Sequence, residues 1–224
     1  MRKYMKQAIC IILIFLMTFS AVTGCTSGMP NNTTQDKTAS HSGVNEKSGD
    51  ETKSIDPDGK KTNADVIVVY FSCTGNTRTI AKTIQNELNA DIYEIKAKNP
   101  YTEDDIKYYT DCRADREQKD PSARPEIVGD LPDISGYNIV FLGYPIWHGQ
   151  APKIVYTFLE SVDMSGKIII PFCTSGSSPI GSSATNLHPL TSDAKWKDGK
   201  RFAAEASKEE IQNWISGLDL QNMK

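Results

Sequence analysis

The sequence predicts an α/β domain built on a doubly wound parallel sheet, and three observations lead to this prediction. Short apolar runs alternate with segments of helical spacing from about Ala64 onward. The first run, Val66–Phe71, is continuously apolar and rich in β-branched residues, which is typical of a strand covered on both faces. Polar loops follow several of the runs. Strands that alternate with helices imply right-handed crossovers and parallel pairing.

The expected elements follow one another in a regular order. The first strand leads through a polar turn into a helix over 78–88, where apolar residues recur at helical spacing. The other expected elements are a strand at 91–95, a helix over 104–116, a strand at 138–142, a helix over 151–159, a strand at 167–172, a short strand near 195–202 and an amphipathic helix over 208–218. These elements make a five-stranded sheet with helices on both faces.

Composition excludes some classes of function. The 224-residue chain has a formal net charge of −3, and acidic residues also outnumber basic ones from Ala64 onward. Nucleic-acid binding needs clustered cations, so no nucleic-acid partner is expected. The globular part contains Cys73, Cys112 and Cys173, whose roles stay open, and it has no Cys-x-x-Cys or Cys/His ligand spacing. We therefore expect no metal site.

The first 24 residues are predicted to be a signal peptide. Basic residues precede an apolar stretch over 8–19, which is shorter than the roughly 20 residues that span a bilayer. The following Val-Thr-Gly-Cys, which ends at Cys25, resembles the lipobox of bacterial lipoproteins. This resemblance implies a lipid on Cys25 and a protein anchored to the extracytoplasmic side of a bacterial cell membrane. An uncleaved membrane anchor is the alternative.

Residues 25–63 are expected to form a disordered tether. They are rich in Ser, Thr, Asn, Lys, Gly and Asp and contain almost no large apolar side chain, so they cannot bury enough surface to order themselves. A flexible coil of this length has a root-mean-square reach of roughly 35 Å. The globular domain is therefore expected to occupy residues 64–224 and to stay close to the membrane.

The first polar loop, 72–77, carries hydroxyls and a glycine between an apolar strand and a helix. Free N–H groups and the helix dipole favour an anion at such a position. An ordinary N-capped turn would explain one hydroxyl but not the whole set. The pattern Ser-x-Thr-Gly-Asn-Thr resembles the phosphate loop of flavodoxins. The resemblance implies that the phosphate of FMN is held by Ser72, Thr74, Gly75, Asn76 and Thr77.

The second loop, 143–152, gathers aromatic side chains between Gly and Pro residues. Exposed aromatic rings are costly without a partner, and a flat isoalloxazine ring would be one. The run Gly-Tyr-Pro-Ile-Trp-x-Gly-x-Ala-Pro resembles the ring-covering loop of a flavodoxin subfamily, which implies cofactor contacts from Tyr144, Pro145, Ile146 and Trp147. Trp147 could instead pack under a neighbouring loop. His148 either donates a hydrogen bond to the flavin or faces solvent.

The third loop, 172–183, is small and rich in hydroxyls, so its backbone can approach the edge of a ring and its pyrimidine carbonyls closely. The pattern Thr-Ser-Gly-x-x-x-x-Gly-Ser-Ser resembles the corresponding loop of the same subfamily. It implies cofactor contacts from Thr174, Ser175, Gly176 and Gly181.

Together these motifs resemble flavodoxins, and specifically the flavodoxin-domain lipoproteins of bacteria, over about 65–218. The resemblance implies FMN as cofactor and a flavodoxin-like sheet with strand order 2-1-3-4-5. The segment 113–125 also fits the family, but its residues suggest no chemistry, and a charged surface helix followed by a loop would explain it.

Two classes of redox function remain. FMN supplies the hard chemistry, and because no nucleophile–base pair is visible, no catalytic side chain is expected. The first class is an enzyme that reduces a quinone or similar small acceptor, a class often completed by a second subunit, so a homodimer would fit it. The second is a one-electron carrier that serves a redox partner at the membrane surface. The aromatic loop favours the enzyme, whereas export favours the carrier, because NAD(P)H is not expected outside the cytoplasm. A flavin-less interaction module on the same fold is a third class.

Overall fold

The strands form one parallel sheet in the computed structural model, which describes residues 65–108 and 110–223. The strand order is β2-β1-β3-β4-β5, with β6 also paired to β4, and this order confirms the predicted flavodoxin-like fold. The predicted signal peptide, the Cys25 motif and the tether lie outside the described residues. The strands are β1 Val66–Phe71, β2 Asp91–Ile95, β3 Ile139–Pro145, β4 Ile168–Thr174, β5 Lys195–Trp196 and β6 Lys200–Phe202.

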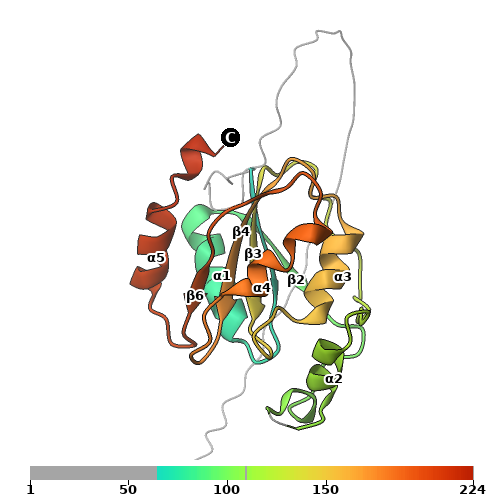
Figure 1. Cartoon of the computed structure of the whole chain (residues 1–224). Coiled ribbons are helices and arrows are strands. Elements are labelled where there is room, and N and C mark those ends of the chain that lie inside the picture. The colour runs from blue at the N-terminus through green and yellow to red at the C-terminus, as the bar shows by residue number, and fades with distance from the viewer. Residues whose placement is uncertain (1–64, 109, 224) are drawn as a thin grey trace, which may run out of the picture. The chain divides into compact units, whose positions relative to one another are not determined.

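Helices cover both faces of this sheet (Figure 1). On one face lie α1 (Asn76–Leu88) and α5 (Lys208–Ser216), and on the other lie α3 (Lys153–Ser161) and the short α4 (Ser182–Thr185). The remaining helical pieces are α2 (Arg113–Lys119) and the 3-10 turns η1 (Asp104–Ile106), η2 (His188–Leu190) and η3 (Leu220–Asn222). Among the described residues, no helix is both long and apolar enough to cross a bilayer.

The apolar run of β1 supplies side chains to both faces of the sheet. Successive side chains of a strand point to opposite faces. Accordingly, Ile67 and Val69 belong to the core under α3, whereas Val66 and Val68 belong to the core under α1 and α5. All residues of β1 are buried. A strand in this position needs apolar residues at every position, which is why its sequence shows no alternation.

The predicted fifth strand is divided in two by a bulge. Ile168 of β4 lies opposite Lys195, and Phe172 of β4 lies opposite Lys200. The edge segment therefore advances by five residues where β4 advances by four. One extra residue in a strand produces such a bulge. A Cβ atom on Gly199, between the two halves, would lie 2.7 Å from a neighbouring carbonyl oxygen. The close approach of the backbone therefore requires glycine there.

The predicted continuous helix over 104–116 is wrong. The chain forms η1, which buries no residue, and a separate α2, which begins only at Arg113. Lys107 has extended dihedral angles and ends the first piece. The segment is highly charged and presents no apolar stripe that packing against the sheet could stabilise. Other predicted boundaries differ less from the structure. The helix predicted over 151–159 begins at Lys153, because Pro152, with ψ of 144°, is not helical.

The centre of β3 contains a glycine that the neighbouring ring requires. A Cβ on Gly143 would lie 2.2, 2.5 and 2.8 Å from three ring atoms of Phe172, which is fully buried. We predict that Gly143→Ala lowers the free energy of unfolding by about 1–3 kcal/mol, because overpacking forces the ring or the backbone to move.

Urea denaturation of the apoprotein measures this effect. Gly136→Ala is the matched control, since a Cβ added at Gly136 would meet no heavy atom within 4 Å beyond its neighbours in the chain. Equal denaturation midpoints for the two variants would contradict the steric argument.

Candidate functional site

The three predicted loops meet at the carboxyl ends of β1, β3 and β4, which are neighbours in the sheet. The second and third loops are joined where the N–H of Ile146 donates to the carbonyl of Thr174 at 3.0 Å. The first and third are joined by the hydroxyls of Thr77 and Thr174, 2.7 Å apart. Both threonines are buried. The structure thus brings together residues that are about a hundred positions apart in the chain.

The first loop turns into α1 through a left-handed glycine. Gly75 has φ of 94°, and its N–H donates to Ser72 Oγ at 3.2 Å. Beyond the adjacent residues, no heavy atom lies within 4 Å of the place where a side chain would stand on Gly75. The amides of Asn76 and Thr77 have no intrahelical acceptor, as at the start of any α-helix. A ligand can therefore approach the positive end of α1 closely at this turn.

The hydroxyls of this loop differ in exposure. Thr74 is exposed, whereas the side chain of Thr77 is 1% exposed and already engaged with Thr174. Arg78, the cation that directly follows the loop in sequence, donates to the carboxylate of Glu94 through Nε at 3.1 Å and through a terminal nitrogen. Because this pairing neutralises Arg78, an anion at the loop would meet neutral donors and the helix dipole. Such a donor set fits a phosphate group.

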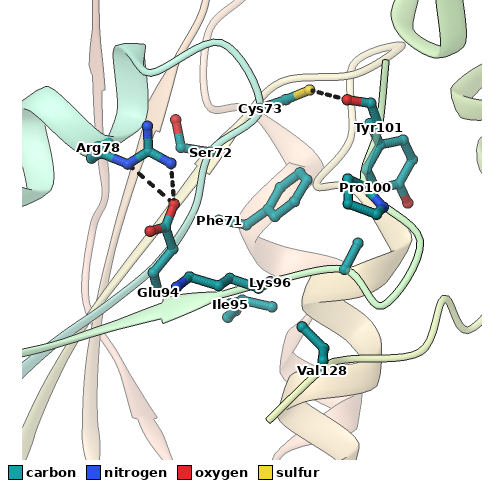
Figure 2. Close-up of a pocket in the computed structure, with 11 residues that line it drawn as sticks. Phe71, Ser72, Cys73, Arg78, Glu94, Ile95, Lys96, Pro100, Tyr101 and Val128 are labelled. Atoms are coloured by element: carbon teal, nitrogen blue, oxygen red, sulfur yellow. Dashed lines mark hydrogen bonds and ion pairs between the residues drawn. The ribbon is translucent and has the colours of Figure 1, made fainter.

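A cavity of about 290 Å³ lies beside the first loop. Its apolar surface includes Phe71, Ile95 and Val128. Figure 2 shows the Arg78–Glu94 pair on one side of the cavity and Tyr101 on the other. Ser72 lines it, but the predicted cofactor residues of the second and third loops do not. The cavity therefore lies next to the place where the three loops meet and is separate from it.

The second loop is a tight hairpin. Trp147 and Gln150 exchange two backbone hydrogen bonds of 2.9 and 3.0 Å. Between them His148 and Gly149 both have positive φ, 49° and 77°. Two consecutive positive φ values define a type I′ turn, which joins strands tightly. Ile146 and Pro145 precede the hairpin and hold it against β4.

The aromatic side chains of this loop have different environments. Trp147 is partly exposed and makes edge contacts with Phe71 and Tyr101, at centroid distances of 5.6 and 5.0 Å. Tyr144 is fully buried, and its hydroxyl lies 3.2 Å from Ser183 Oγ. Burial raises the pKa of Tyr144 well above its ordinary value. Tyr144 therefore supports the loops from below, whereas Trp147 stands at the surface of the site.

His148 does not simply face solvent. Its ring stacks on Tyr108 at a centroid distance of 5.2 Å, and its Nε2 lies 3.8 Å from a carboxylate oxygen of Asp115 on α2. A protonated imidazole would be attracted to this carboxylate. Contact of His148 with a cofactor stays a prediction.

The third loop is held by its own hydroxyl and by β6. The Ser175 N–H donates to Phe202 O at 3.2 Å, and its hydroxyl donates to Ser178 O. Gly176 follows with an exposed backbone, and Gly181, at φ of 46°, precedes α4. Since the Ser175 hydroxyl is engaged within the loop, this segment offers a ligand mainly its backbone.

Comparison with known proteins decides the family. A family model described as Flavodoxin matches residues 65–218. The chain belongs to the flavodoxin family. No curated protein sequence matches it.

Solved structures of flavoproteins agree with this assignment. A Bacteroides eggerthii protein classed as a flavoprotein is 37% identical, with a TM-score of 0.64, and the match covers 70% of this chain and 98% of that one. A second, from Bacteroides uniformis, is 34% identical with a TM-score of 0.65, covering 68% and 98%. A Lactobacillus acidophilus flavoprotein in complex with FMN is 19% identical with a TM-score of 0.51, covering 68% and 99%, and shows the shared fold.

The flavodoxin domain contains supporting residues that the sequence did not reveal. Gln118 of α2 donates to the carbonyls of Trp147 and Ala151, at 3.0 and 3.1 Å, and so fixes both ends of the hairpin. Gln150 links the second and third loops through Ser182 and Asn186. The resemblance of 113–125 to the family is the one sequence feature that pointed to the segment containing Gln118, although its residues suggested no role.

The cysteines of the described residues are all free. Cys173 is buried in β4, and burial raises its pKa to about 12. A thiol with this pKa is almost entirely protonated at neutral pH and is a poor nucleophile. Burial also raises the pKa of Cys73, whose sulfur faces the Tyr101 carbonyl at 3.8 Å. Within the described residues, no cluster of three or more His, Cys, Asp or Glu could hold a metal.

Proposed function

We propose that this flavodoxin-family domain binds FMN and carries out redox chemistry with it. The observation that supports the proposal most is the first loop, where Gly75 opens the start of α1 and exposed Thr74 stands beside it. This loop is tied to the third through the Thr77–Thr174 hydroxyl pair. A phosphate bound at α1 would therefore place the rest of the ligand along loops of fixed relative position. FMN bound to the Lactobacillus acidophilus flavoprotein is consistent with this proposal.

The chain's own groups then have separate tasks. The start of α1 and the hydroxyl of Thr74 bind the phosphate, and the hairpin around Trp147 limits the access of water to the ring. The N–H groups of Gly176 and Ser177 would face the ring edge, because the Ser175 N–H is bonded to Phe202 and the Ser175 and Gly176 carbonyls accept from Arg201. FMN supplies the transfer of electrons, and the protein supplies binding, orientation and electrostatics.

As the acceptor we propose a quinone or a similar small molecule. The cavity beside the first loop has an apolar surface that suits a flat ring. Two of its lining residues, Phe71 and Tyr101, make edge contacts with Trp147. A second copy of the chain could complete such a site, so a homodimer would be compatible with it. The alternative function is a one-electron carrier that docks on a redox partner at the membrane surface.

The phosphate loop provides the test of FMN binding. We predict that Thr74→Ala weakens FMN binding at least about tenfold, because one hydrogen bond to a charged group is worth about 1.5–3 kcal/mol. Riboflavin, which lacks the phosphate, should bind the variant and the wild type alike. Fluorescence titration measures both ligands. Equal weakening of FMN and riboflavin would show that the loop does not bind the phosphate.

The cavity provides the test of the acceptor. We predict that anaerobically reduced protein is reoxidised by menadione with a rate that saturates as menadione rises, measured by stopped flow. Val128→Asp, which puts a charge on the apolar wall, should raise the half-saturating concentration several-fold. Leu131→Asp alters a similarly exposed apolar residue outside the cavity and serves as control. A rate that rises linearly in all three proteins would favour the carrier.

We further propose that the protein is a lipoprotein on the extracytoplasmic side of a bacterial cell membrane. The Val-Thr-Gly-Cys sequence ending at Cys25 supports this proposal. Cys25→Ser should abolish incorporation of a radioactive fatty acid and leave the precursor unprocessed. Cys10→Ser, within the apolar stretch, is the matched control and should leave labelling intact. Label retained in the Cys25 variant would refute lipidation at this residue.

A further inference from the structure

An arginine of β6 lies against the backbone of the third loop. Arg201 donates through Nε to Ser175 Oγ at 3.2 Å, and one terminal nitrogen donates to the carbonyl of Ser175 at 2.6 Å. The same nitrogen donates to the carbonyl of Gly176. Two consecutive carbonyls of the loop therefore point toward one guanidinium group.

Arg201 differs from its neighbour in its electrostatic surroundings. Lys200 pairs with Glu210 at 3.3 Å. In the part of the chain that the structure describes, no carboxylate forms an ion pair with Arg201. Its partly buried charge acts on the loop without a neutralising anion. Burial of Cys173 raises the pKa of that thiol, and the positive charge of Arg201 opposes the shift, so the field of the arginine extends to β4.

Peptide geometry determines where the other ends of these two peptide groups point. In a trans peptide the C=O and N–H bonds are antiparallel. Because the carbonyls of Ser175 and Gly176 face the guanidinium, the N–H groups of Gly176 and Ser177 face away from it. Both residues are exposed, and no acceptor among the described residues receives these two N–H groups. Two adjacent donors, with a cation behind them, form a site for an electron-rich acceptor.

We propose that Arg201 is a positioning residue that raises the affinity of the domain for reduced FMN relative to its affinity for oxidised FMN. This inference rests on the proposed binding of FMN, with the edge of its ring at the third loop. Reduction adds negative charge to the ring, and the amides of Gly176 and Ser177 stabilise that charge more than they stabilise the oxidised ring. Arg201 orients the amides and adds its own field. The midpoint potential is therefore less negative than it would be without this side chain.

The experiment compares Arg201→Met with Lys200→Met, which removes an equal charge from the adjacent position. Spectroelectrochemical titration gives the midpoint potential, and fluorescence titration gives the affinity for oxidised FMN. Arg201→Met should weaken reduced FMN relative to oxidised FMN by about tenfold, which corresponds to a two-electron midpoint about 30 mV more negative. Lys200→Met should change this ratio less than twofold.

Several results would overturn the inference. If Arg201→Met and Lys200→Met give the same ratio of affinities for reduced and oxidised FMN, Arg201 acts only through its net charge. Equal weakening of both redox states would mean that it only supports the loop. If Arg201→Met does not fold, Arg201→Lys, which keeps the charge but loses the fork of donors, should shift the ratio at least threefold, and a smaller shift refutes the inference. Failure of the wild type to bind FMN at all would instead refute the proposed function.

Discussion

The parallel pairing of β1, β3 and β4 is the constraint on which the rest of this structure depends. Parallel strands need a crossover between them, and the helices of the crossovers bury both faces of the sheet. For that reason β1 is apolar at every position. The same pairing sends the carboxyl ends of the three strands to one edge, so loops that are distant in sequence become neighbours. The site is a consequence of sheet topology.

Hydrogen bonds between the loops turn this proximity into a fixed arrangement. The Thr77–Thr174 hydroxyl pair lies beneath the first and third loops, and the Ile146 amide connects the second to the third. Gln118 fixes the hairpin from a helix outside the sheet layers. The buried Thr77–Thr174 pair stabilises one geometry because leaving either hydroxyl unpaired would be costly.

Charge is distributed unevenly over the site. At the first loop Glu94 neutralises Arg78, which leaves the dipole of α1 and neutral donors to face an anion. At the third loop Arg201 has no ion-pair partner among the described residues, and it donates hydrogen bonds to the carbonyls of Ser175 and Gly176. In our proposals the first arrangement binds a phosphate, and the second stabilises the charge that reduction adds. The two ends of one ligand would thus meet different electrostatic environments.

The sequence by itself determined the fold class and the three loops, because burial on both faces and turn composition are local signals. The strand order followed only from the resemblance of the loop motifs to those of flavodoxins. It did not determine the break between η1 and α2, where no apolar stripe favours a continuous helix. Nor could it show that Tyr144 lies in the core or that Gln118 and Arg201 hold the loops. Those roles depend on contacts between residues far apart in the chain. Only the tertiary structure decides such contacts, because side-chain partners are set by packing and not by local sequence.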